Sequence, residues 1–210
     1  TGVVSKNSSI VLRNFGQLNF DPLTECYSYS RVKQTRFIKL SQPILLNDDN
    51  FKAQETSVIC NDIITQESQN GILAVGLDKL LINKCLIDNY DFSSFINPID
   101  PCGDIDLIKI ENVKEFVLNQ NEIQLNKPAQ TFGIANAINV INCGASGNII
   151  LNNNILSFGT SFQSNGVRIS GLNSGIDIFC NTFNGFYNGI NVESGAVVPR
   201  IWNHPKFTSS

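Results

Sequence analysis

A short phrase that repeats along the second half of the chain constrains the fold more than any other feature. The phrase has two apolar residues separated by one other residue, then an asparagine, then another apolar residue, as in the copy that begins at Ile176 and contains Asn181. Alternation of apolar and polar residues at period two indicates strands with one buried face. Strands this short, recurring without hairpin turns between them, predict the successive rungs of a solenoid rather than a meander.

The copies of this phrase align in columns. The asparagine column is predicted to hold Asn61, Asn121, Asn154 and Asn181, with Cys85 in one copy. In the copy that contains Asn154, Ile149 and Leu151 are the expected inward residues. A second apolar pair precedes each copy, at Ile72/Ala74, Ile108/Ile110, Ile138/Val140, Val167/Ile169 and Ile190/Val192. Because the intervals between copies are unequal, we expect fixed strands joined by turns of variable length.

The asparagine column has a physical reason. The backbone at the corner of a rung cannot join a strand ladder, and a stacked amide can bond to the amide or the backbone of the neighbouring rung. Asparagine also tolerates the left-handed backbone conformation that a tight corner requires. The sequence therefore predicts files of like side chains, with rungs about 4.8 Å apart.

This pair of phrases resembles the right-handed parallel β-helix of the pectin-lyase-like superfamily. The resemblance implies an all-β fold, with residues 51–210 forming the β-helix, in a stack of about seven rungs that is roughly 35 Å long. Residues 1–50 fit the repeat poorly. We expect them to form an N-terminal cap with irregular strands, plus one or two imperfect rungs. The alternative is that part of this segment contacts another subunit.

Composition limits the classes of partner. The formal net charge of −3 and the pI near 5.1 provide no basic surface for nucleic acid. No apolar run is long enough to span a membrane. The chain has no methionine and no visible signal peptide, so we expect a mature product after cleavage or a piece of a longer protein. Its six cysteines lack the spacing of a zinc site and are either disulfide partners or small buried residues.

The longest insertion between repeat copies, residues 88–106, is the candidate ligand-binding loop. Its candidate residues are Asp88, Tyr90, Asp91, Asp100, Asp104 and Asp106. Clustered carboxylates can hold Ca²⁺, the one cofactor we consider, and an aromatic side chain can stack on a sugar ring. The alternative is a solvated loop without a ligand. Two further insertions, 126–135 and 157–165, come after the same phrase, so we expect all three on one side of the stack.

The C-terminal residues have the pattern of a degenerate last rung. Trp202 either closes the core from this end or anchors a neighbouring subunit, since large aromatic residues are common in interfaces.

The enzymes of the superfamily act from the outer surface of one sheet, with paired carboxylates or with Ca²⁺ and a basic residue. The strands around Arg168 and Asp177 are similar to two strands of polygalacturonases, but the central aspartate of the second motif is missing, the order is reversed and no Gly-His-Gly occurs. We therefore assign no catalytic residue.

The leading hypothesis is a secreted or cell-surface structural or adhesive module. Such a module would self-associate, as the subunit of a filament or fibre, and could bind polysaccharide. The alternative is a polysaccharide lyase or glycoside hydrolase with its acids in the 88–106 insertion.

Overall fold

The protein folds into three parallel sheets and is all-β. The computed structural model describes residues 10–13, 20–21, 26–27, 31–33, 36–38, 44–47, 56–60, 63–66, 70–89, 104–126, 133–144, 147–158, 163–197, 200–202 and 206–208, and these contain strands and turns but no helix. Each of the three sheets has seven strands.

Sheet A consists of β1 (Ile10–Arg13), β6 (Ile44–Asn47), β9 (Ile72–Val75), β12 (Ile105–Glu111), β15 (Ala135–Ile141), β18 (Ser164–Ser170) and β21 (Asn188–Val192). Sheet C consists of β4 (Arg31–Lys33), β7 (Thr56–Cys60), β10 (Lys79–Asn83), β13 (Glu115–Asn119), β16 (Asn148–Leu151), β19 (Ile176–Phe179) and β22 (Arg200–Trp202). Sheet D consists of β5 (Arg36–Ile38), β8 (Ile63–Gln66), β11 (Leu86–Asp88), β14 (Glu122–Asn126), β17 (Asn154–Phe158), β20 (Thr182–Asn184) and β23 (Lys206–Thr208).

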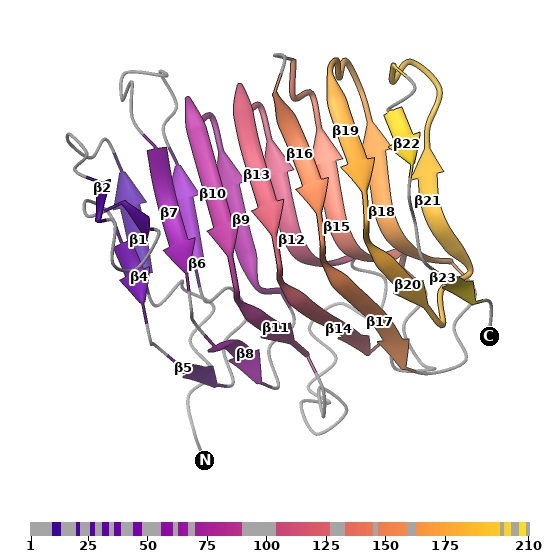
Figure 1. Ribbon diagram of the computed structural model, residues 1–210, viewed down its shortest axis with the longest axis horizontal. Helices are drawn as coiled ribbons and strands as arrows, with labels where there is room; N and C mark the ends of the chain where they lie inside the picture. The colour runs from indigo at the N-terminus through magenta and orange to yellow at the C-terminus, as the bar shows by residue number, and fades with distance from the viewer. Residues whose placement is uncertain are drawn as a thin grey trace.

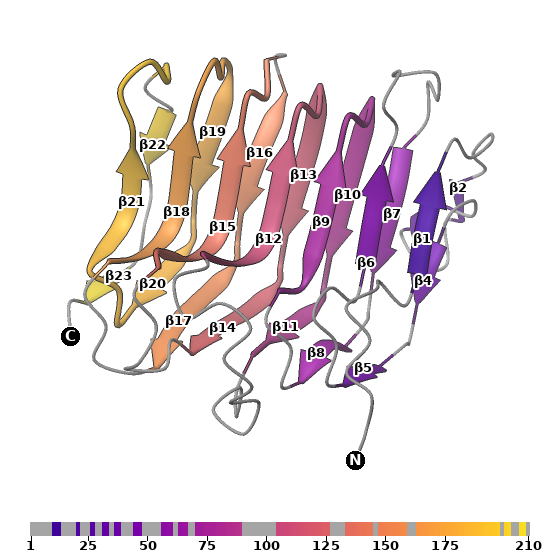
Figure 2. The ribbon, with the colours of Figure 1, turned by 180° about the vertical axis from the view of Figure 1, so that it is seen from behind.

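The chain visits the three sheets in the same order on every rung. After β9 in sheet A come β10 in sheet C and β11 in sheet D, and the next rung repeats this order with β12, β13 and β14. Figure 1 shows sheet C in front with sheet D below it, and Figure 2 shows sheet A from the other side. The architecture is a parallel β-helix of seven rungs, which confirms the predicted fold class.

The N-terminal residues contribute to the stack. Strands β1, β4, β5 and β6, all before residue 50, belong to the three sheets, and β6 pairs with β9 from Ile44↔Ile72 to Asn47↔Val75. Only β2 (Phe20–Asp21) and β3 (Cys26–Tyr27) stand apart among the described strands, as an antiparallel pair called sheet B. Two rungs therefore begin within residues 1–50, and the N-terminal cap stays a prediction.

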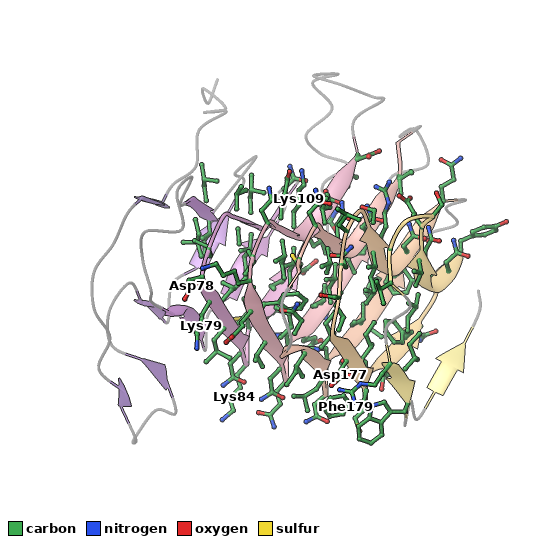
Figure 3. The ribbon with its side chains drawn as sticks, turned by 90° about the horizontal axis from the view of Figure 1, so that it is seen from above. Asp78, Lys79, Lys84, Lys109, Asp177 and Phe179 are labelled. Carbon is green, nitrogen blue, oxygen red and sulfur yellow. The ribbon has the colours of Figure 1, made fainter. Side chains whose placement is uncertain are left out.

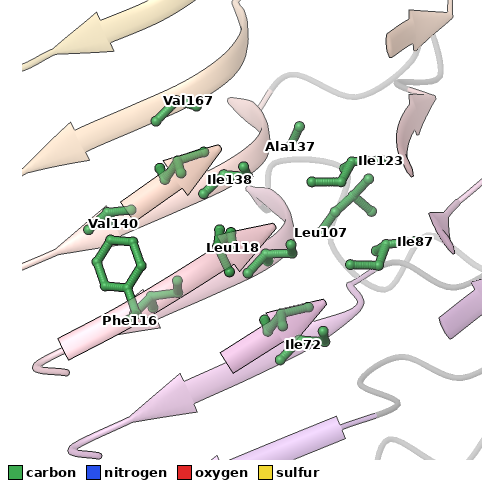
Figure 4. Packing of buried hydrophobic residues seen from close by; sticks show 14 of the residues in the cluster. Ile72, Ile87, Leu107, Phe116, Leu118, Ile123, Ala137, Ile138, Val140 and Val167 are labelled. Carbon is green, nitrogen blue, oxygen red and sulfur yellow. The ribbon is translucent and has the colours of Figure 1, made fainter. Parts of the chain in front are cut away.

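The core consists of files of like side chains. In sheet A, Ile108 is in register with Ile72 on one side and with Ile138 on the other. In sheet C, Ile82, Leu118, Ile150 and Ile178 form an inward file, and all four are fully buried. Figure 4 shows this packing between the sheets. Burial of each such side chain contributes about 1.5–3 kcal/mol relative to its exposed state.

The corner between sheets C and D is built the same way on four successive rungs. Its first residue has a positive φ of 54–55°, at Lys84, Gln120, Asn152 and Cys180. This left-handed conformation turns the chain, and the next residue then points into the core.

That next residue supplies the predicted amide ladder. The Asn153 Oδ1 accepts hydrogen bonds from the Asn121 backbone N–H at 3.0 Å and from the Asn121 Nδ2 at 2.9 Å. The Asn181 Oδ1 accepts the equivalent pair from Asn153, both at 2.9 Å. At the other end, the Asn121 Oδ1 accepts the Cys85 backbone N–H at 3.0 Å. Each Nδ2 also donates to a backbone carbonyl of the preceding rung, for example from Asn153 to Leu118 at 3.0 Å.

The predicted ladder was wrong by one residue in the copy that contains Asn154. Asn153 occupies the ladder and is buried, whereas Asn154 is exposed at the start of β17. The inward residues shift with it, because Asn148 and Ile150, rather than Ile149 and Leu151, are buried. The runs Ile149–Leu151 and 152–154 each consist of three residues of one kind, so the sequence fits the ladder with either Asn153 or Asn154 in it. The left-handed conformation of Asn152 marks the corner and places Asn153 in the ladder. Asn61 lies outside the described residues.

All three insertions connect sheet D to sheet A. They leave from β11, β14 and β17 and enter β12, β15 and β18, so their ends lie at the same corner of the β-helix, as expected.

Candidate functional site

A second file of amides lies where the sheet A strands begin, directly after the insertions. Asp106, Asn136, Asn165 and Asn188 are in register on β12, β15, β18 and β21. The Asn188 Nδ2 donates to the Asn165 Oδ1 at 3.0 Å, and the Asn165 Nδ2 donates to the Asn136 Oδ1 at 2.8 Å. The Asn136 Nδ2 donates to the Asp106 Oδ1 at 2.8 Å, so the file ends on a carboxylate.

Sequence reasoning missed this file, although the sequence carries a signal for it. Each member lies two positions before the first residue of an apolar pair, as Asn136 does before Ile138 and Asn165 before Val167. The prediction considered only the asparagines that come after an apolar pair.

Asp106 is the chemically unusual member. Its Oδ2 accepts a hydrogen bond from the Asn139 Nδ2 at 3.0 Å, and its backbone N–H donates to the Asn70 Oδ1 at 3.1 Å. Burial raises the pKa of the Asp106 carboxyl above its ordinary value, and the nearby Asp104 carboxylate raises it further. The hydrogen bonds from Asn139 and Asn136 oppose this rise, as does the charge of Lys109, but they do not cancel it.

Arg168, which is in register with Asn139 on the neighbouring strand, is shared between two acids. Its Nε donates to the Glu193 Oε1 at 2.8 Å, and its Nη1 lies 4.0 Å from the Asp104 Oδ2. Its side chain is 18% exposed. The guanidinium is therefore already neutralised by carboxylates of this chain.

Asn139 completes the arrangement with an unsatisfied acceptor. The residue is 3% exposed, and its Oδ1 has no hydrogen-bond partner although it is buried. A buried polar atom without a partner costs about 1–3 kcal/mol, so its presence in a folded protein calls for an explanation. We call Asp104, Asp106, Asn136, Asn139, Arg168 and Glu193 the acid–amide cluster.

A row of hydrogen-bonding residues runs through this cluster along the stack. Lys109, Asn139, Arg168 and Asn191 are in register on four consecutive strands of sheet A. They alternate with the inward apolar pairs and hence point outward. Lys109 pairs with Glu111 at 3.0 Å. Figure 3 shows Lys109 on the opposite side of the molecule from Asp177 and Phe179.

Only two of the predicted loop residues come together in this cluster. Asp104 and Asp106 lie at the start of β12, whereas Asp88 is on sheet D, 8% exposed and in register with Gln124. Tyr90, Asp91 and Asp100 lie outside the described residues. Among the described side chains, no three of His, Cys, Asp or Glu are close enough to hold a metal ion.

The two strands that are similar to polygalacturonase strands do not form one site. Arg168 is on β18 of sheet A, and Asp177 is on β19 of sheet C. Asp177 instead accepts two hydrogen bonds from Arg200, both at 2.5 Å, and this pairing raises the Arg200 pKa above its ordinary value.

Trp202 does not close the core. It is in register with Phe179 on the outer face of sheet C and stacks on that ring, with centroids 4.7 Å apart and an interplanar angle of 18°. Trp202 is 50% exposed, while the inward Ile201 beside it is 44% exposed. A contact between Trp202 and another subunit stays a prediction.

The cysteines that the structure describes with their side chains are free thiols. Cys85 and Cys143 are buried, and Cys180 is half-buried. Burial raises the pKa of the Cys143 thiol to about 11, which makes it a poor nucleophile. These three therefore behave as small apolar residues, one of the two alternatives that the sequence left open.

Within the described part of the chain there is no helix of the length and apolarity needed to cross a membrane. Comparisons with protein-family models, with curated proteins and with solved structures found no match to this chain.

Proposed function

We propose that the protein is a structural and adhesive β-helix module of a cell surface or secreted assembly, and that it binds glycans along the outer face of sheet A. The acid–amide cluster is the observation that carries this proposal. It combines acceptors and donors suited to sugar hydroxyl groups, and it stands on strands whose positions are fixed by the stack.

Regular spacing supports the same interpretation. The outward row from Lys109 to Asn191 offers one hydrogen-bonding side chain per rung, at about 4.8 Å intervals. That interval is close to the length of one sugar unit in an extended glycan chain. A linear polysaccharide lying along the stack would therefore meet one polar side chain of this row on each rung.

The test is binding of the whole chain to a glycan array, followed by titration of the best binders. Asn139→Ala should weaken binding about tenfold, because one hydrogen bond is lost and its partner is left unpaired. Asn119→Ala is the matched control, since Asn119 is also an outward asparagine but lies on sheet C, bonded to the Asn83 Oδ1 at 3.1 Å. Equal losses in both variants, or no binding by the parent, would exclude this surface.

A glycoside hydrolase or polysaccharide lyase is the second candidate, and Asp106 is the observation that favours it. A carboxyl group with a raised pKa beside a second carboxylate, Asp104, is the pairing that general acid catalysis of glycosidic bond cleavage uses. Release of reducing sugars or unsaturated products from a polysaccharide panel, abolished in Asp106→Asn, would establish this activity. Binding without any turnover would leave adhesion as the function.

A further inference from the structure

Charge at the acid–amide cluster indicates the class of glycan, an inference that rests on the proposed function. We infer that the outer face of sheet A takes a neutral, hydroxyl-rich glycan and rejects uronate or sulfated chains.

The first reason for a neutral ligand is the balance of charge in the cluster. The one guanidinium of the cluster, that of Arg168, faces two carboxyl groups, those of Glu193 and Asp104. Asp106 adds a third carboxyl group to the cluster. Lys109, two strands away from Arg168 in the same outward row, is held by Glu111 at 3.0 Å. Each cation of this face that the structure describes is thus compensated, and the surplus is negative. A carboxylate or sulfate on a ligand would meet like charge here, and like-charge contacts at an interface disfavour the wrong partner.

The second reason for a neutral ligand is the unpartnered Asn139 Oδ1. This atom only accepts hydrogen bonds, and so do the ionised carboxylates beside it. The group that would satisfy them is a donor without negative charge. A sugar hydroxyl meets this need, and it can accept in return from the Arg168 guanidinium or the Asn191 amide on the next two rungs.

The salt dependence of binding should reflect this chemistry. Hydrogen bonding between a neutral glycan and the cluster involves no release of counterions, so the affinity should stay nearly constant between low and high salt. Binding through Arg168 to an acidic chain would instead weaken steeply as salt is added.

The experiment uses the whole chain and three probes of equal length: a neutral cello-oligosaccharide, a neutral xylo-oligosaccharide and an oligogalacturonate. We expect at least one neutral probe to bind, with an affinity about tenfold weaker in Asn139→Ala and unchanged in Asn119→Ala. The double variant Asp104→Asn/Glu193→Gln frees Arg168 and should gain affinity for oligogalacturonate. Thermal unfolding of each variant shows whether weaker binding comes from the loss of one contact or from loss of the folded state. If Asn139→Ala does not fold, Asn191→Ala is the alternative variant in the same outward row.

Each outcome decides a different claim. Preference of the parent chain for oligogalacturonate would overturn the neutral class while leaving glycan binding intact. Absence of binding to all three probes and to the wider array would overturn the glycan-binding proposal itself.

Discussion

At the scale of single residues, the stack depends on the side chain that comes directly after each left-handed corner. This side chain must satisfy a backbone N–H and an amide of the neighbouring rung, which Asn153 and Asn181 do by accepting from the residue one rung before them. The corner residue itself varies in type, as Lys84 and Gln120 show beside Asn152 and Cys180. The requirement for a particular residue type at the corner therefore falls on the position directly after the left-handed residue.

The first prediction uses two adjacent asparagines. Asn153→Ala removes the acceptor for two Asn121 donors and the donor to the Leu118 carbonyl, and should lower the free energy of unfolding by roughly 2–4 kcal/mol. Asn154→Ala, at an exposed position, should change it by less than about 0.5 kcal/mol. Urea denaturation monitored by circular dichroism compares the two. If Asn154→Ala lowered the free energy of unfolding more than Asn153→Ala, Asn154 rather than Asn153 would be the ladder residue.

The second prediction concerns pH and Asp106. Its pKa is raised in the folded protein, so the folded state holds the proton more tightly than the unfolded chain does. The charged carboxyl therefore destabilises the fold, and this cost develops as pH rises from the ordinary carboxyl pKa to the raised value. Below that window the cost is absent.

Asp106→Asn should accordingly be more stable than the parent at neutral pH, and the difference should disappear in acid. The Asn139 amide can turn to present its Oδ1 to the new Nδ2, which keeps a hydrogen bond between the two side chains. Denaturation midpoints across pH measure this difference, with Glu122→Gln, at an exposed site of sheet D, as the control for loss of charge. A difference that is independent of pH would contradict the raised pKa.

At the scale of elements, the apolar pairs predicted the strands of sheets A and C, because like side chains must lie over one another in a stack. Register failed where three asparagines in a row gave two acceptable alignments. Half of the acid–amide cluster could be predicted from the sequence. Asp104 and Asp106 stood out as acids, but Arg168 and Glu193 join them only through the parallel pairing of β12, β15, β18 and β21. Contacts across about thirty residues of sequence depend on rung length, which varies here.

The third prediction tests the bend from sheet D into sheet A. Gly166 lies under the Phe183 ring, and a Cβ there would come 2.5 Å from the Gly189 carbonyl oxygen and 2.5 Å from the ring. Gly166→Ala should cost about 1–3 kcal/mol, because backbone or ring must shift. At Gly144, where a Cβ would meet nothing within 4 Å, the same change should be nearly neutral. Equal costs in thermal denaturation would argue against close packing at this bend.

At the scale of the whole molecule, a β-helix is stable as a sum of rungs and of the contacts between neighbouring rungs. An interior rung is covered on both sides and the last rung on one. The inward file of sheet C illustrates this difference, since Ile150 and Ile178 are fully buried whereas Ile201 in the same file is 44% exposed. We therefore expect the C-terminal rung to open before the rest.

Trp202, the only tryptophan of the chain, reports on that rung through its stacking on Phe179. With increasing urea, its fluorescence should change before the circular dichroism of the sheets is lost. Ile150→Ala should lower the global stability by about 2–5 kcal/mol, whereas Ile201→Ala should shift mainly the fluorescence transition. Coincident transitions in the parent chain would mean that the seven rungs unfold as one unit. A partner bound at this end should bring the two transitions together, because it would cover Ile201 and Trp202, so the same measurement also tests the predicted subunit contact.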